Sequence, residues 1–205
     1  MCLPISDLSQ KTIRQPVTSG VGGNTFTRWG KKTCPHNGTV LLYSGYMAGG
    51  SYKHTGSPSS YLCLPPDPQW GQFDDKVQST GIPISGAEYE FDARDRVKFY
   101  GTEIHNQDAP CAVCLTSRSS VVTIPARNQC YAGWTREYHG YLAAGHHAHA
   151  ASSDFLCLDE RPEILEGGQA NVNGKLMYFT EARCDNLRCP PYVNGRELTC
   201  VVCSK

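Results

Sequence analysis

Short apolar runs separated by glycine and proline clusters predict strands along most of the chain. The runs span residues 39–47, 60–64, 88–91, 120–126, 135–143, 154–158 and 175–182. They are rich in tyrosine, valine and leucine, and none has the length expected of a long amphipathic helix. The chain also has 20 glycines and 13 prolines, which favour turns. The sequence therefore predicts an all-β fold built from short strands.

The strand candidates recur because the chain contains two similar segments. Residues 34–54 align with 130–149 with one deletion, residues 60–68 align with 154–162, and residues 109–116 align with 198–205. The offset falls gradually, from 96 between Cys34 and Cys130 to 89 between Cys111 and Cys200. Landmarks in the same order at nearly constant offset indicate a tandem duplication. We expect two pseudo-symmetric β units, over 26–120 and 121–205, after an N-terminal arm over 1–25.

Charge and cysteine content narrow the class of protein. The 19 Lys and Arg residues balance the 19 Asp and Glu residues, so the chain has no basic footprint for nucleic acid or an anionic membrane. No apolar run approaches the roughly 18 residues of a membrane span. Eleven cysteines are typical of a secreted protein, in which they form cross-links. We also expect glycosylation at Asn37, which opens an Asn-Gly-Thr acceptor triplet in a turn-like segment.

Four cysteine positions recur in each unit, and they allow more than one chemistry. The two Cys-x-x-Cys segments, at Cys111 and at Cys200, could together hold a tetrahedral zinc ion. Zinc would leave the other repeated cysteines without partners, and a redox role would require a thioredoxin-like context that the sequence lacks. Structural disulfides are therefore favoured. The spacing alone leaves three pairings open for four cysteines, and Cys2 stands alone.

The segment Tyr138–His149 contains four of the seven histidines. In the alignment, His149 faces His54, whereas the other three histidines face serine or tyrosine. A duplicated metal site would keep its ligands in both units, so we interpret His54 and His149 as buried or loop-fixing residues. A single metal site at His146, His147 and His149 is the alternative, because imidazoles suit zinc, copper or nickel. A glycan contact is a third interpretation.

Several motifs resemble a known family of extracellular domains. They are "CPHNGTVLLYSGY", "PCAVC" and "IPARNQCYAGWTREYHGY", which are similar to the C-terminal non-collagenous domain of type IV collagen. The segments "RWGKKTCP", "YLCLPPDP" and "CPPYVNGRELTCVVC" more closely resemble the corresponding domain of sponge short-chain, spongin-like collagens and related secreted invertebrate proteins. The likeness extends from about Thr25 to the end of the chain, and it implies a β-rich fold with two pseudo-symmetric halves.

The resemblance also implies a disulfide pattern and a mode of assembly. Carried onto this sequence, the pattern is Cys34–Cys114, Cys63–Cys111, Cys130–Cys203, Cys157–Cys200 and a local Cys184–Cys189 bridge. The first unit has no cysteines for a local bridge of that kind. No Gly-X-Y run precedes the domain, so this chain cannot form a collagen triple helix itself. The family forms trimers, and we expect a homo-oligomer, a trimer or a dimer.

Two functions remain as hypotheses, and neither is enzymatic. The chain lacks Gly-x-Ser-x-Gly, His-Glu-x-x-His and phosphate-loop motifs, and Cys111 beside His105 is expected to be oxidised. We expect a secreted matrix or assembly module that self-associates and contacts matrix proteins or glycans. The alternative is a lectin that uses an exposed aromatic loop, with candidate ligand contacts at Trp70, Tyr52, Tyr61 and Asp67. We expect no cofactor, and calcium near Asp67, Asp74 and Asp75 is left open because their spacing matches no loop motif.

Overall fold

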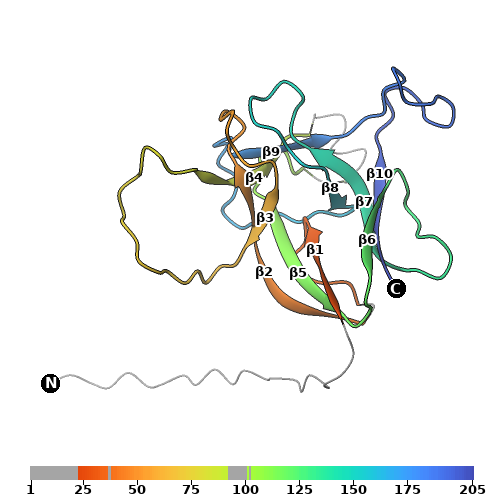
Figure 1. The fold of residues 1–205 in the computed structure, drawn as a ribbon, viewed down its shortest axis with the longest axis horizontal. Helices are drawn as coiled ribbons and strands as arrows, with labels where there is room; N and C mark the ends of the chain where they lie inside the picture. Colours follow the sequence, from red (N-terminus) through yellow and green to blue (C-terminus); the bar gives the residue numbers. More distant parts are fainter. Residues whose placement is uncertain (1–22, 37, 92–100, 102) are drawn as a thin grey trace.

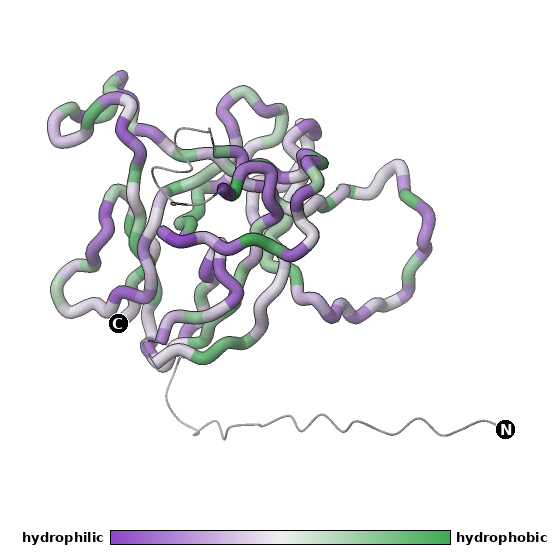
Figure 2. The backbone as a smooth tube through the Cα atoms, turned by 180° about the vertical axis from the view of Figure 1, so that it is seen from behind, coloured by the Kyte–Doolittle hydropathy of each residue, from purple (hydrophilic) through white to green (hydrophobic). Residues whose placement is uncertain are grey.

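A computed structural model describes residues 23–36, 38–91, 101 and 103–205, and their fold is all-β as predicted, without a helix (Figure 1). The first five strands are β1 (Asn24–Trp29), β2 (Thr39–Gly50), β3 (Tyr61–Leu64), β4 (Ile84–Tyr89) and β5 (Pro110–Thr116). The last five are β6 (Val121–Pro125), β7 (Thr135–Ala144), β8 (Leu156–Asp159), β9 (Lys175–Phe179) and β10 (Thr199–Ser204). The connection between β3 and β4 forms a wide loop that projects away from the sheet (Figure 1, Figure 2).

The strand predictions missed three strands. The seven predicted runs overlap seven observed strands, but β1, β5 and β10 were not expected. β1 begins at Asn24, inside the predicted arm. β5 lies between β1 and β2, and five of its seven residues are buried, so it lacks the alternation of a half-exposed strand. The two Cys-x-x-Cys segments therefore carried no strand signal of their own.

The ten strands form one mixed sheet, in the order β6-β10-β7-β8-β1-β5-β2-β4-β9, with β3 paired to β2. In the first five strands, β1 pairs with β5, and β2 pairs with β3, β4 and β5. In the last five, β6 pairs with β10, and β7 pairs with β8, β9 and β10. The same connectivity therefore occurs twice along the chain. That the two units are pseudo-symmetric products of a duplication stays a prediction.

Five disulfides join the cysteines in the pairs that the resemblance implied: Cys34–Cys114, Cys63–Cys111, Cys130–Cys203, Cys157–Cys200 and Cys184–Cys189. Cys111 and Cys114 lie three residues apart on β5, so their side chains point to opposite faces of the sheet. Their Cα atoms are about 10 Å apart at the rise of a strand, beyond the ~7 Å that one disulfide can span. The two cysteines of each motif therefore cannot pair with each other, and the zinc alternative is wrong because their sulfur atoms are oxidised.

The disulfides stay within each half, but the hydrophobic core does not. One buried cluster combines Met47 and Tyr89 from the first half with Leu158 and Met177 from the second. Strand β4 also pairs in parallel with β9 through residues 87–89 and 175–177. Neither half buries its apolar face alone, so the two predicted units share one core.

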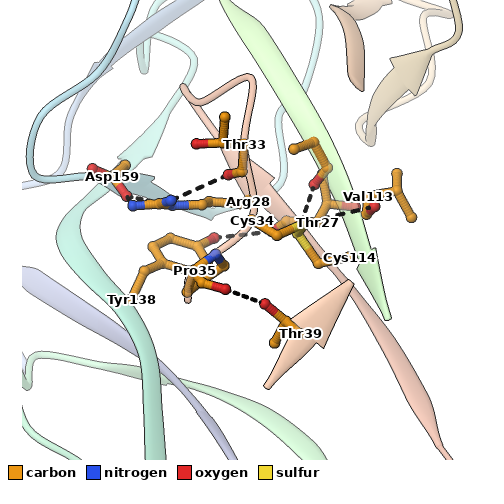
Figure 3. Close-up of a disulfide and its surroundings, with 11 residues drawn as sticks. Thr27, Arg28, Thr33, Cys34, Pro35, Thr39, Val113, Cys114, Tyr138 and Asp159 are labelled. Atoms are coloured by element: carbon orange, nitrogen blue, oxygen red, sulfur yellow. Dashed lines mark hydrogen bonds and ion pairs between the residues drawn. A yellow bond between two sulfur atoms is a disulfide. The ribbon is translucent and has the colours of Figure 1, made fainter. Parts of the chain in front are cut away.

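An ion pair crosses the seam between the halves beside the Cys34–Cys114 disulfide (Figure 3). Arg28 Nε on β1 lies 2.8 Å from Asp159 Oδ2 on β8, and the Asp159 side chain is only 3% exposed. Arg28 Nη1 also donates to the Thr33 carbonyl. The Tyr138 hydroxyl lies 3.0 Å from the carbonyl oxygens of Thr27 and Cys157. Strand β1 is thereby tied to the second half by side chains as well as by its β8 bridge.

We predict that the disulfides differ in stability contribution because they close loops of different length. The Cys34–Cys114 bridge spans a sequence separation of 80, and Cys184–Cys189 spans 5. Replacing both cysteines of a pair by alanine should lower the free energy of unfolding by about 4.5 kcal/mol for the long loop and about 2 kcal/mol for the short one. Urea unfolding of both double variants measures this. Equal losses would contradict it.

The Arg28–Asp159 pair should couple the two halves energetically. Arg28→Met leaves the buried Asp159 carboxylate unpaired, so we expect a loss of about 3 kcal/mol in the free energy of unfolding. Asp159→Asn in the same chain should recover part of that loss, giving a double-mutant cycle with clear coupling. Arg161, whose side chain is 81% exposed beside Glu160, is the control, and Arg161→Met should cost less than about 0.5 kcal/mol. Additive losses at Arg28 and Asp159 would exclude the coupling.

Candidate functional site

The first part of β2 has an open edge. Residues 39–46 pair with β5 on one side, whereas β3 covers the other side only from Tyr46 to Gly49. In the described part of the chain, no strand pairs with the free side of residues 39–44. Val40 and Leu42 are 58% and 63% exposed there, and this part of the tube is coloured as hydrophobic in Figure 2. An unpaired apolar strand edge is a template for pairing with another chain.

The equivalent part of β7 in the second half is polar. Both strands carry a bulge at the same place, with Leu42 unpaired in β2 and Glu137 unpaired in β7. Registers against β5 and β10 then place Leu41 opposite Cys114 and Arg136 opposite Cys203. The first half therefore has Val40, Leu41 and Leu42 where the second has Thr135, Arg136 and Glu137.

The charge of Glu137 is paired within the chain through Oε1, whereas its Oε2 atom is buried without a hydrogen-bond partner among the described residues. The Glu137 side chain is buried, and its Oε1 lies 2.7 Å from Nη2 of Arg118, which comes from the link between the halves. The Ser204 hydroxyl donates to the same carboxylate oxygen. Ser204 matches Leu115 of the first half, and Leu115 is exposed. In the second half this position is therefore occupied by buried polar groups that contact one another. In the first half it is occupied by apolar side chains that are exposed to solvent.

The histidine segment forms a turn after β7. His149 N–H donates to the His146 carbonyl, and His54 N–H donates to the Ser51 carbonyl in the matching turn of the first half. The two turns are thus fixed through the backbone. The His149 ring is half-buried and lies 4.7 Å from the Tyr52 ring, but the His54 side chain is exposed. Of the expected buried or loop-fixing role, burial does not hold for His54, which takes part in its turn through the backbone.

The predicted metal site at His146, His147 and His149 is not supported by the geometry. The rings are near one another, with centroids 4.3 Å apart for His146 and His147 and 5.4 Å apart for His146 and His149. However, they stack as tilted rings, and His146 Nδ1 accepts a hydrogen bond from the Ala148 N–H. Among the described residues, no group of three or more His, Cys, Asp or Glu side chains is arranged to hold a metal ion, and this includes the acidic residues near Asp67, Asp74 and Asp75.

A cavity of about 1020 Å³ lies beside the histidine turn. The turn, the 151–155 segment, the end of β9, and Glu90 with His105 all contribute to its lining. Burial raises the pKa of Glu90, while His105 lowers it and Glu88 raises it further. Burial also raises the pKa of Tyr178 to about 12, so its hydroxyl stays protonated at neutral pH. No sequence signal brings Glu90 or His105 to this place, because neither lies in a repeated motif.

The four residues predicted to contact a ligand are not brought together. Tyr61 is 8% exposed and belongs to the core, where its hydroxyl accepts a hydrogen bond from Ser153, so its prediction as a ligand contact is wrong. Tyr52 packs on His149. Trp70 is 76% exposed and Asp67 is also exposed, both on the projecting loop. Asn37 and Cys2 lie outside the described residues.

No protein-family model matches the chain. The resemblance to the collagen non-collagenous domain therefore stays a prediction.

No helix in the described residues has the length and apolar character to cross a membrane.

We predict that His149 makes the fold weaker in acid. Burial lowers its pKa from 6.5, and His146, Lys175 and His147 lower it further. Below pH 6.5 the unfolded chain takes up the proton more readily than the folded chain, so the free energy of unfolding should fall until the pH passes below the folded pKa. His149→Gln should reduce the difference in urea midpoint between about pH 7.5 and about pH 5.

The matched control is His54→Gln, because His54 occupies the equivalent turn with an exposed side chain. It should keep the pH dependence of the unsubstituted protein. If His149→Gln also keeps it, His149 is not the responsible group.

Proposed function

We propose that the protein is a non-enzymatic, secreted extracellular-matrix or assembly module that self-associates through the open edge of β2. The main support for this proposal is the contrast between the two halves at one structural position, where Leu42 is exposed and Glu137 is buried and ion-paired. Five disulfides favour an oxidising, extracellular compartment. Matrix proteins and glycans are further partners in this proposal.

The partner at the edge is a second copy of the chain. Two β2 edges pair antiparallel about a two-fold axis, so that each strand offers the other its free N–H and C=O groups over residues 39–44. Val40 and Leu42 of each copy then become buried against the other. The bulge at Leu42 limits the length of edge that pairs, and the two-fold contact uses the same edge on both copies, so the assembly closes as a dimer.

Carbohydrate binding is a second candidate function. The exposed Trp70 on the projecting loop offers an aromatic face, but the loop brings no buried polar group to it. The observation that favours carbohydrate binding is instead the cavity beside the histidine turn. Its aromatic and polar lining is a suitable surface for hydroxyl-rich ligands.

If the protein self-associates through this edge, replacing the apolar residues of the edge by the polar residue types found in the second half should dissociate the assembly. Val40→Thr combined with Leu42→Glu removes apolar area and places a like charge on both edges. We expect the dissociation constant for self-association to rise at least about tenfold, equivalent to 1.4 kcal/mol. Sedimentation equilibrium over a range of concentrations measures the change. Because the contact is apolar and backbone-mediated, raising the salt concentration should not dissociate the parent protein.

The control variant is Val122→Thr, at an exposed position of β6 on the other end of the sheet. It should associate as the parent protein does. A parent protein that is monomeric at every concentration, or a β2 variant that still associates normally, would exclude the edge as the interface.

A further inference from the structure

The cavity beside the histidine turn has one wall made of aromatic rings. Tyr178 lies 5.1 Å from His146 and 5.6 Å from His149 between ring centroids, and His146 continues the chain of rings to His147. Phe155, which is 67% exposed, adds a further apolar face to the lining. Aromatic side chains that line a cavity offer an apolar surface against which the C–H face of a sugar ring can pack.

Another part of the lining is formed by two polar side chains, Glu90 and His105. Glu90 Oε1 and His105 Nδ1 are buried, and neither has a hydrogen-bond partner among the described residues. Glu90 Oε2 lies 3.8 Å from His105 Nδ1, too far for a hydrogen bond. Buried polar atoms in native proteins are nearly always paired. These two atoms are shielded from solvent, but the Glu90 and His105 side chains are 12% and 34% exposed, so a ligand hydroxyl can donate to the Glu90 carboxylate after a small side-chain rotation.

The charges of the lining favour a neutral ligand. Glu181 pairs with Arg183 at 3.0 Å, and Glu90 faces His105. With the imidazoles neutral, two carboxylates and one guanidinium give the lining a net charge of −1. A sulfated or carboxylated glycan would meet this charge unfavourably. An ammonium ligand would have to compete with Arg183 for Glu181, which already pairs with it.

We propose that this cavity binds neutral saccharides, with the sugar C–H face against Tyr178 and its hydroxyls at Glu90 and His105. The proposal deepens the second candidate function and is independent of self-association through β2. The volume of the cavity, about 1020 Å³, is at the upper end of the range of small-ligand sites, so the cavity accommodates more than one sugar residue. The Arg183–Glu181 pair at the rim supplies both donors and acceptors for further hydroxyls.

The experiment is a glycan array of the full chain, with neutral and acidic glycans side by side, followed by calorimetry with the neutral oligosaccharide that binds best. We expect binding to neutral glycans. Glu90→Gln and Tyr178→Ala should each raise the dissociation constant at least about tenfold, because the first removes the charged acceptor and the second removes the ring face. Circular dichroism and the urea midpoint of each variant establish that it is folded.

Trp70→Ala is the matched control, because Trp70 is an exposed aromatic residue away from the cavity lining. It should bind as the parent protein does. If glycan binding is lost in Trp70→Ala and kept in Glu90→Gln, carbohydrate binding stands but this cavity is not its site. If the chain binds only acidic glycans, or none, the proposal is overturned. The β2 edge variant should still bind, so failure of one proposal is distinguishable from failure of the other.

Discussion

The fold depends on two strands, β5 and β10, that are cross-linked to other parts of the chain through cysteines three residues apart. Because the side chains of a strand alternate, Cys111 and Cys114 leave β5 from opposite faces and reach Cys63 on β3 and Cys34 in a loop. The same arrangement joins β10 to β8 and to the β6–β7 connection. Each strand is thereby fixed from two directions, which keeps a long, turn-rich chain in one register.

The cross-links define two halves, but apolar burial makes them one body. Parallel pairing of β4 with β9 and the Arg28–Asp159 pair cross the seam. Lys175 does so too: its buried side chain donates to the carbonyls of Ser59 and Ser152, one in each half. A half on its own would expose the apolar face that the other half covers. The cavity depends on this arrangement, because its lining includes Glu90 from the first half and Tyr178 from the second half.

The proposed functions come from positions at which the halves differ. The shared connectivity fixes both bulges, but only the second half neutralises its edge with Glu137 and Arg118. Likewise, the histidine turn has a matching turn at Ser51–His54, but only the second turn adds the rings that line the large cavity. Both proposals therefore rest on residues that distinguish the two halves and not on the strand connectivity that the halves share.

The sequence by itself determined the β class and the number of cysteines available for cross-links, because these follow from local composition, and its self-similarity predicted two similar units. Residue patterns alone left the cysteine pairing open, because pairing depends on which face of a strand each sulfur leaves, and β5 and β10 had no visible alternation. Tyr61 and Trp70 are both aromatic residues near Pro- and Gly-rich segments, yet one is in the core and the other is in solvent. Only the tertiary structure decided this, and only it brought Glu90, His105 and Tyr178 to one cavity, because burial and proximity are set by contacts between residues far apart in the chain.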